Sequence, residues 1–147
     1  MKADRVTVRA AQWPADRDRL AQVRETVFVV EQGVPRELEW DGEDAGATHW
    51  LAEDGGGVPI GVARLLRTGQ IGRMAVLQPW RGHGIGARLL AAALDGARAR
   101  GLAEVWLNAQ TSALPFYARQ GFVAEGGEFE EAGIPHRRMR LRWEDAT

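Results

Sequence analysis

The sequence predicts one domain with a mixed α/β (α+β) fold, in which a mostly antiparallel sheet of about six to seven strands is flanked by about four helices. Three observations lead to this fold class. Glycines 55–57 separate two strand-like runs, residues 84–100 have the apolar spacing of a long helix, and residues 138–143 alternate arginine with apolar side chains. The first indicates antiparallel pairing, and the other two indicate elements with one buried face.

Composition supports a single core over residues 1–147, because a chain of 147 residues fits one domain. The chain is 45% apolar and 27% charged, as in ordinary globular proteins. Nineteen basic and 20 acidic residues leave a net charge of -1, so we expect neither nucleic acid nor a membrane as partner.

The absence of cysteine excludes disulfides, a thiolate nucleophile and cysteine-ligated metals, and no metal site is predicted. Residues 1–10 lack the apolar core of a signal peptide, and no run reaches the roughly 18 apolar residues of a membrane span. We therefore expect a cytoplasmic protein.

The first half alternates strands and helices. Residues 6–10 form an alternating strand, and residues 16–28 form a helix with an apolar face of Leu20, Val23 and Val27. Glycine and proline interrupt residues 29–42, which predicts a short helix or ordered loop over a pocket. Residues 48–53 and 59–66 form a hairpin, and residues 70–76 extend it to a three-stranded meander.

The second half begins with the clearest helix, residues 84–100, which Gly101 ends. The remaining elements are a strand at 105–109, a helix at 113–120, a strand at 122–124 and a last strand at 138–143. Residues 126–136, between the last two strands, are predicted as a loop.

A glycine-rich turn, R-G-H-G-I-G at residues 81–86, lies between the strand ending at Val76 and the long helix. The first amides of a helix lack partners and carry a partial positive charge, so Gly82, Gly84 and Gly86 predict an anion site. A P-loop is excluded because the only lysine is Lys2. The dinucleotide fingerprint is excluded by the glycine spacing and by the meander before the turn.

The spacing of Arg81, Gly84 and Gly86, followed by L-N-A-Q at 107–110 and F-Y-A-R-Q-G-F at 116–122, resembles the GCN5-related N-acetyltransferase (GNAT) superfamily. The segments V-F-V-V-E-Q-G-V-P, G-R-M-A-V and F-E-E-A-G-I-P-H are similar to its small bacterial ElaA-like branch. The resemblance covers nearly the whole chain, from about residue 6 to Trp143.

This resemblance implies a sheet split into a V by a bulge in the strand before the turn, with acetyl-CoA as co-substrate in the cleft. Its acetyl group would pass directly to a primary amine of a small molecule or peptide. Pantetheine would pair with backbone of Met74, Ala75 and Val76, and the pyrophosphate would take amides of Arg81, Gly82, His83, Gly84, Ile85 and Gly86. Asn108 would contact coenzyme A or a bridging water, or act as a structural amide.

Tyr117 is the only tyrosine and matches the residue that, in resembling enzymes, donates a proton to the coenzyme A sulfur. A phenol of pKa about 10 is a donor at neutral pH. The alternative is a tyrosine that only packs beside Phe116 and Phe122.

The general base is open, because many resembling enzymes carry a glutamate on the strand before the turn and this chain has I-G-R-M there. The candidates, acting directly or through water, are Glu31, Asp41, His49 and His136. His136 has an imidazole suited to proton transfer, or it only begins the last strand. Glu31 and Gln32 are expected to be buried and to bind an acceptor ammonium or the loop backbone.

Other polar and aromatic residues are given structural roles. His83 is expected to face solvent, Trp40 and Trp80 to pack in the core, and the arginines 138, 140 and 142 to form a solvated strand face. The arginines other than Arg81 are interpreted as compositional. The acceptor pocket is assigned to residues 29–42 and 126–136, and an exposed strand edge allows a homodimer.

Two further functions compete with catalysis. The missing strand glutamate suggests a non-catalytic acyl-CoA-binding sensor or scaffold. A pure interaction protein would require the glycine turn to be accidental.

Overall fold

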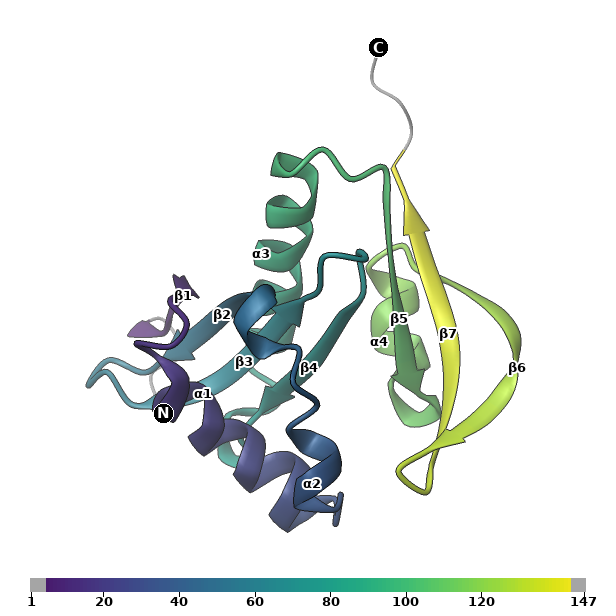
Figure 1. The fold of residues 1–147 in the computed structure, drawn as a ribbon. Helices are drawn as coiled ribbons and strands as arrows, with labels where there is room; N and C mark the ends of the chain where they lie inside the picture. The colour runs from purple at the N-terminus through teal and green to yellow at the C-terminus, as the bar shows by residue number, and fades with distance from the viewer. Residues whose placement is uncertain (1–4, 144–147) are drawn as a thin grey trace.

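A computed structural model describes residues 5–143, so both ends of the predicted 1–147 domain lie outside the described residues. The chain forms two antiparallel sheets, which lie side by side in Figure 1. The first, the four-stranded arm, has the order β1 (Thr7–Ala11), β2 (Thr48–Glu53), β3 (Pro59–Leu65) and β4 (Ile71–Val76). The second, the three-stranded arm, has the order β5 (Glu104–Gln110), β7 (Ile134–Arg142) and β6 (Val123–Glu131). The helices are α1 (Arg17–Arg24), α2 (Arg36–Glu39), α3 (Ile85–Ala99) and α4 (Leu114–Arg119). The predicted fold class is confirmed.

The four-stranded arm is covered on both faces. Every residue of β3 is buried, and the adjacent residues Val62 and Ala63 belong to different hydrophobic clusters. Ala63 packs with Leu89 and Leu90 of α3, whereas Val62 packs with Leu20 of α1. Successive side chains of a strand point to opposite faces, so α1 and α3 cover opposite sides of the sheet.

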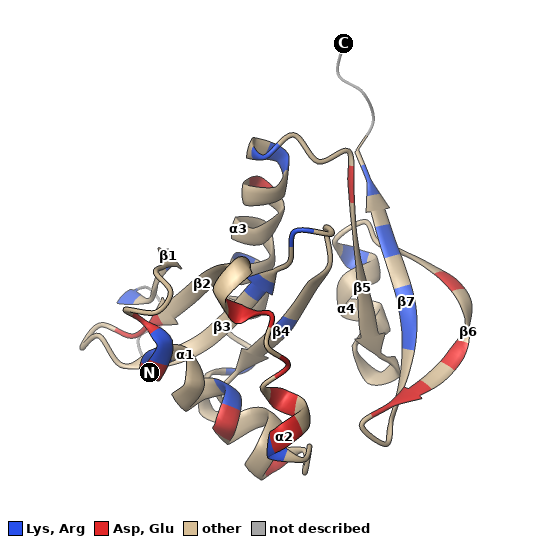
Figure 2. Cartoon of the chain, in the orientation of Figure 1, with Lys and Arg blue, Asp and Glu red and all other residues tan. Residues whose placement is uncertain are grey.

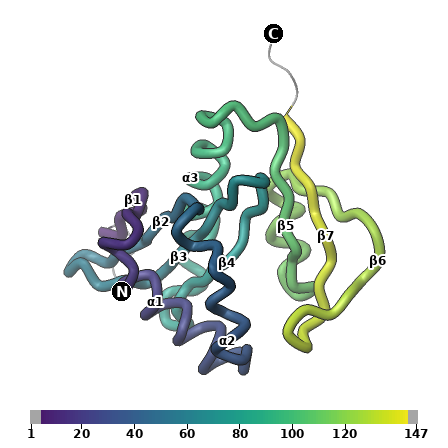
Figure 3. The backbone as a smooth tube through the Cα atoms, viewed as in Figure 1, coloured from purple at the N-terminus to yellow at the C-terminus, as the bar shows by residue number. Residues whose placement is uncertain are grey.

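The two arms touch where β4 and β5 begin and then diverge (Figure 3). A single parallel bridge joins Gln70 to Trp106, whose N–H donates to the carbonyl of Gly69 at 3.1 Å. The predicted bulge is present, because the β3–β4 register jumps between Val62–Ala75 and Arg64–Gly72. Arg73 lies within the bulge with φ of 47°. The V-shaped splay implied by the resemblance is therefore present.

The predicted helix over 16–28 is present, but its last four residues are π-helical. The α-helix ends at Arg24, and residues Glu25–Glu31 continue as a π-helical segment, η2. A π-turn has a wider winding than an α-turn, so it moves later side chains off the buried face. Val30 is 75% exposed, and Glu31 is exposed where burial was predicted.

The loop predicted over 126–136 is a strand hairpin. β6 extends to Glu131, and β7 begins at Ile134 after a turn with positive φ at Ala132 and Gly133. The pattern was missed because β6 is almost entirely exposed and lacks an apolar alternation. Acidic bands on β6 lie beside basic bands on β7 (Figure 2).

The arginine row of β7 is not simply solvated. Arg140 pairs with Glu104 at 2.6 Å and with Glu125 at 2.9 Å. The Arg138 guanidinium lies over the Trp106 ring, 4.1 Å from its centroid. These contacts join all three strands of the arm across one face.

Candidate functional site

The glycine turn has the geometry of an anion site. β4 leads through a 3-10 turn at Gln78–Trp80 to Gly82 and Gly84, which have φ of 82° and 77°, and α3 follows directly. A Cβ added at either glycine would meet nothing within 4 Å, so the surrounding space is open. The turn therefore presents free helix N-terminal amides. His83 is exposed, as predicted.

Gly86 differs from the other two glycines of the turn in its backbone conformation. It lies inside α3 without a positive φ, and a Cβ there would be 3.6 Å from Cζ of Phe116. That is an ordinary contact, so the position accepts a methyl group. The backbone freedom of glycine is needed only at Gly82 and Gly84.

Arg81 connects the turn to the segment before α2. Its Nη1 and Nη2 atoms each donate to Glu31 at 2.7 Å, and Nε donates to the carbonyl of Val76 at 2.9 Å. The hydrogen bonds from Arg81 lower the pKa of Glu31. The guanidinium thus holds the turn in place, and the backbone amides stay available for an anion.

Gln32, the residue after Glu31, contacts the three-stranded arm. Gln110, the last residue of β5, donates from Nε2 to Oε1 of Gln32 at 2.9 Å. Glu31 therefore binds Arg81 in the glycine turn that follows β4, and Gln32 binds Gln110 at the end of β5. We call these two contacts the interarm clasp.

Tyr117 lies on α4 in an apolar setting. Its ring contacts Phe116 and Phe122 with centroid distances of 5.0 and 5.9 Å, and Oη lies 3.8 Å from Sδ of Met74. Burial raises the pKa of the phenol to about 12. Both features expected of Tyr117 are thus compatible, because a packed phenol that stays protonated is also a proton donor.

His136 is buried in β7 between the other two strands of its arm. Its partners in register are Gln110 of β5 and Phe129 of β6, and its ring stacks on Phe129. Nδ1 lies 2.7 Å from the carbonyl of Ile134, and a carbonyl only accepts. In the neutral ring the proton is therefore assigned to Nδ1, which leaves a lone pair on Nε2, 3.6 Å from Glu131.

Asp41 and His49 are held by structural contacts. Burial by itself would raise the pKa of Asp41, but hydrogen bonds from Arg64 and from the amide of Glu43 outweigh it and bring the value to about 2. Burial lowers the pKa of His49, whose Nε2 donates to the carbonyl of Asp44 at 2.9 Å. Neither group is poised to accept a proton near neutral pH.

A buried charge network was missed in the sequence. Arg24 pairs with Glu39 at 2.7 Å and with Asp44 at 2.8 Å, and Arg64 pairs with Asp44 at 3.1 Å. Arg73, in the bulge, contacts Glu39 at 3.1 Å. The interpretation of these arginines as compositional is wrong. A usable signal was Arg64, a charge within a predicted strand whose other residues are apolar or glycine.

Asn108 lies on β5 where the arms separate. Its Oδ1 is buried and has no hydrogen-bond partner within residues 5–143. Backbone donors alternate sides along a strand, so the N–H of Asn108 faces the same side as that of Trp106, toward β4. An orphaned acceptor in this position fits a ligand that donates hydrogen bonds.

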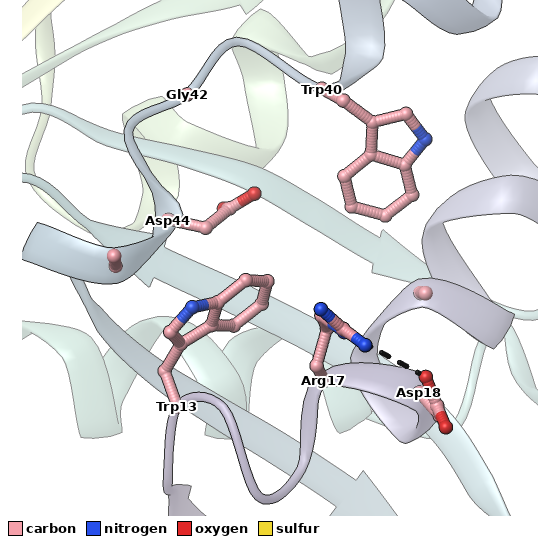
Figure 4. A pocket seen from close by; sticks show the side chains of 8 residues that line it. Trp13, Arg17, Asp18, Trp40, Gly42 and Asp44 are labelled. Carbon is pink, nitrogen blue, oxygen red and sulfur yellow. Dashed lines mark ion pairs between the residues drawn. The ribbon is translucent and has the colours of Figure 1, made fainter.

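Of the two tryptophans predicted to pack in the core, one does and the other does not. Trp80 packs against the hydrophobic core, as expected. Trp40 instead lines a surface pocket together with Trp13 (Figure 4).

Comparison with known proteins identifies the family. The model of the acetyltransferase (GNAT) domain matches residues 16–143. The uncharacterised N-acetyltransferase YjcF of Bacillus subtilis is 40% identical over 121 residues, covering 80% of this chain and 86% of YjcF. The chain therefore belongs to the GNAT family of acetyltransferases.

Solved structures agree with that assignment. Escherichia coli ElaA superposes with a TM-score of 0.84 and 27% identity, covering 93% of this chain and 99% of ElaA. An acyl-CoA N-acyltransferase from Pseudomonas aeruginosa gives a TM-score of 0.81 and 32% identity, covering 92% of this chain and 99% of that chain. The resemblance to the small ElaA-like branch is confirmed.

Neither a clustered metal site nor a membrane-spanning helix occurs within residues 5–143. No group of three or more histidine, aspartate or glutamate side chains there is arranged to hold a metal ion. None of the helices in that range is long and apolar enough to cross a membrane.

Proposed function

We propose that the chain is an N-acetyltransferase that moves the acetyl group of acetyl-CoA directly to a primary amine of a small molecule or peptide. The observation that carries this proposal is the glycine turn at the N-terminus of α3, which follows the end of β4 that has diverged from β5. The turn offers an anion site, and the diverging strands offer unpaired backbone beside it.

The chain's own groups match the parts of an acyl-CoA. Amides of residues 81–86 would bind the pyrophosphate, and backbone of Met74, Ala75 and Val76 would pair with pantetheine. The orphaned Oδ1 of Asn108 would accept a hydrogen bond from a pantetheine amide or a bridging water. Acetyl-CoA, when bound, supplies the activated thioester. The Arg81–Glu31 pair supports the role of Arg81 as a positioning residue.

Tyr117 is proposed as the general acid. As the amine nitrogen bonds to the carbonyl carbon and the C–S bond breaks, Oη of Tyr117 gives its proton to the departing sulfur. The pKa of about 12 keeps the phenol protonated. Its contact Met74 belongs to β4, the strand proposed to bind pantetheine. This arrangement needs no covalent enzyme intermediate.

His136 is proposed as the base, directly or through water. An alkylamine of pKa about 10.4 is almost wholly protonated near neutrality, which costs about 4 kcal/mol. Glu31 and Asp41 are engaged by arginines, whereas Nε2 of His136 keeps a lone pair in the neutral ring. The pairing of His136 with Gln110 puts it near the interarm clasp.

The first test is ligand binding by thermal shift with acetyl-CoA, coenzyme A and NAD. A ligand at 100 times its dissociation constant adds about 2.7 kcal/mol of stability, so both coenzyme A forms should raise Tm and NAD should not. No shift with either coenzyme A form would sink the proposal.

The second test is thiol release over a panel of amines. Tyr117→Phe should lower kcat by about 100-fold or more while leaving the affinity for coenzyme A unchanged. Equal turnover in the variant would remove Tyr117 from the mechanism. His136→Gln should lower turnover in the same assay, and its coenzyme A affinity serves as the internal control.

A sensor or scaffold that binds acyl-CoA without turnover is the second candidate. It is favoured by the engagement of both acidic base candidates, Glu31 and Asp41, in ion pairs. Binding of acetyl-CoA with no thiol release for any amine would select it. The cytoplasmic location, the homodimer and the lack of nucleic-acid or membrane partners stay predictions.

A further inference from the structure

A surface pocket of about 490 Å³ lies between the first turn of α1 and the segment that follows α2. Its wall includes Trp13, Arg17, Ala21, Trp40 and Asp44. None of these residues belongs to the glycine turn, the splay or the interarm clasp. The volume falls in the range of small-molecule sites, which is about 300 to 1,000 Å³.

The two indoles are held in place from behind. Trp13 stacks on His49, which is 2% exposed, with a centroid distance of 5.3 Å and an interplanar angle of 22°. The Arg24 guanidinium, 1% exposed, lies 4.4 Å from the centroid of the Trp40 ring, and Nε1 of Trp40 donates to Glu25 at 3.3 Å. Since buried residues cover one face of each ring, the other face of each is left for the pocket.

The Arg17 side chain extends from α1 beside the Trp13 ring and forms the ion pair with Asp18 that Figure 4 marks. Within the described residues its guanidinium makes no hydrogen bond, and its ion pair with Asp18, which also lines the pocket and is 97% exposed, is long at 3.9 Å. The amides of the first turn of α1 add a partial positive charge at the same end. Asp44, the other acid of the wall, is already paired with Arg24 and Arg64.

We propose that this pocket is a second binding site, distinct from the acyl-transfer site, for a small planar aromatic carboxylate. The ring would stack between Trp13 and Trp40, and the carboxylate would take a two-pronged hydrogen bond from Arg17. The preformed aromatic walls select a flat ligand, and the Arg17 guanidinium, whose ion pair with exposed Asp18 is long at 3.9 Å, selects an anion over an amine.

The test uses the full chain and measures dissociation constants by calorimetry and tryptophan fluorescence. The probes are indole-3-carboxylate, the matched cation indole-3-methylamine and the non-aromatic cyclohexanecarboxylate. We expect the first to bind and each of the others to bind at least about tenfold more weakly. No binding of indole-3-carboxylate, or tighter binding of the amine, would overturn the assignment.

Two variants place the ligand in this pocket. Arg17→Gln should weaken binding of indole-3-carboxylate at least about tenfold, because it removes a charged hydrogen-bond donor. Ala21→Leu keeps a good helix former and should abolish binding by filling the pocket. Arg100→Gln changes an exposed arginine at the far end of α3 and is the matched control.

Unchanged affinity in both pocket variants would overturn the proposal. Saturating acetyl-CoA should leave the affinity for indole-3-carboxylate unchanged, and competition between the two would also overturn it. These outcomes do not depend on whether the chain turns over an amine.

Discussion

The two arms of the sheet differ in how they are supported. In the four-stranded arm all seven residues of β3 are buried, with α1 on one face and α3 on the other. In the three-stranded arm eight of the nine residues of β6 are exposed. The anion turn follows the buried arm, whereas His136 lies in the exposed one. The difference indicates that the strand before the proposed pyrophosphate site is held by packing on both faces of its sheet, whereas β6, the outer strand of the other arm, has little packing to constrain its sequence.

The largest expected effect tests this difference in packing. Leu89→Ala in α3 should destabilise the fold by about 2 to 5 kcal/mol, because the side chain is fully buried and a cavity would remain. Val123→Ala in β6, where the side chain is 69% exposed, should cost under about 1 kcal/mol. Urea denaturation of both variants checks the pair, and equal costs would contradict the comparison.

Two glycines, one packed against the four-stranded arm and one in β6, test the same difference through the space around a single added methyl group. A Cβ at Gly96 of α3 would lie 2.5 Å from Cζ2 of Trp50, so Gly96→Ala should destabilise by about 1 to 3 kcal/mol despite the better helix propensity of alanine. A Cβ at Gly127 of β6 would meet nothing within 4 Å and φ there is not positive, so Gly127→Ala should be neutral or slightly stabilising.

Denaturation at fixed pH measures both glycine variants. Adding Trp50→Phe removes the atoms that clash, so the cost of Gly96→Ala should shrink in that background. A cost that stays the same would show that Trp50 is not the cause.

The next effect is a loss of folding stability at low pH. The pKa of Asp16 is lowered to about 2, first by the hydrogen bond from Arg9, and that of Asp41 is also about 2, because arginine contacts outweigh its burial. Both folded values lie below the unfolded value of about 3.9. Their contribution is therefore present above about pH 4 and is lost as pH falls toward 2, by about 1 kcal/mol each after screening.

Denaturant midpoints between about pH 5 and pH 2.5 measure this loss. Asp41→Asn should be less stable than the parent at neutral pH but should show a shallower decline on acidification. Parallel curves for the two proteins would rule out a linkage through Asp41.

The smallest effect tests the clasp that connects the arms. Glu31→Gln should raise KM for acetyl-CoA a few-fold, about 1 kcal/mol or less, with kcat and Tm nearly unchanged, because the Arg81–Glu31 pair is half-exposed. Arg36→Gln breaks another exposed arginine–glutamate pair, with Glu25, and serves as the control. A large fall in kcat in Glu31→Gln would instead indicate that Glu31 is the general base.

Much of the buried arm was predictable from sequence, because its signals are local. The spacing of Leu89, Leu90 and Ala93 predicted α3, and the glycines 55–57 predicted the β2–β3 hairpin. β6 was predicted as only three residues, since an exposed acidic strand carries no apolar period. The same holds for the candidate site: the glycine turn was predicted from its local spacing, whereas the exposure of Glu31 was not.

The order of residues was enough to define the family, the meander and the glycine turn, because periodicity and glycine spacing act over a few residues. Folding in three dimensions decided which charges meet. Arg24 and Asp44 are 20 positions apart, and Arg81 and Glu31 are 50 apart, yet each pair lies within hydrogen-bonding distance. Such pairings depend on how helices and strands pack, and no local pattern specifies them. The same packing brought Arg17 and two indoles from separate segments to one pocket.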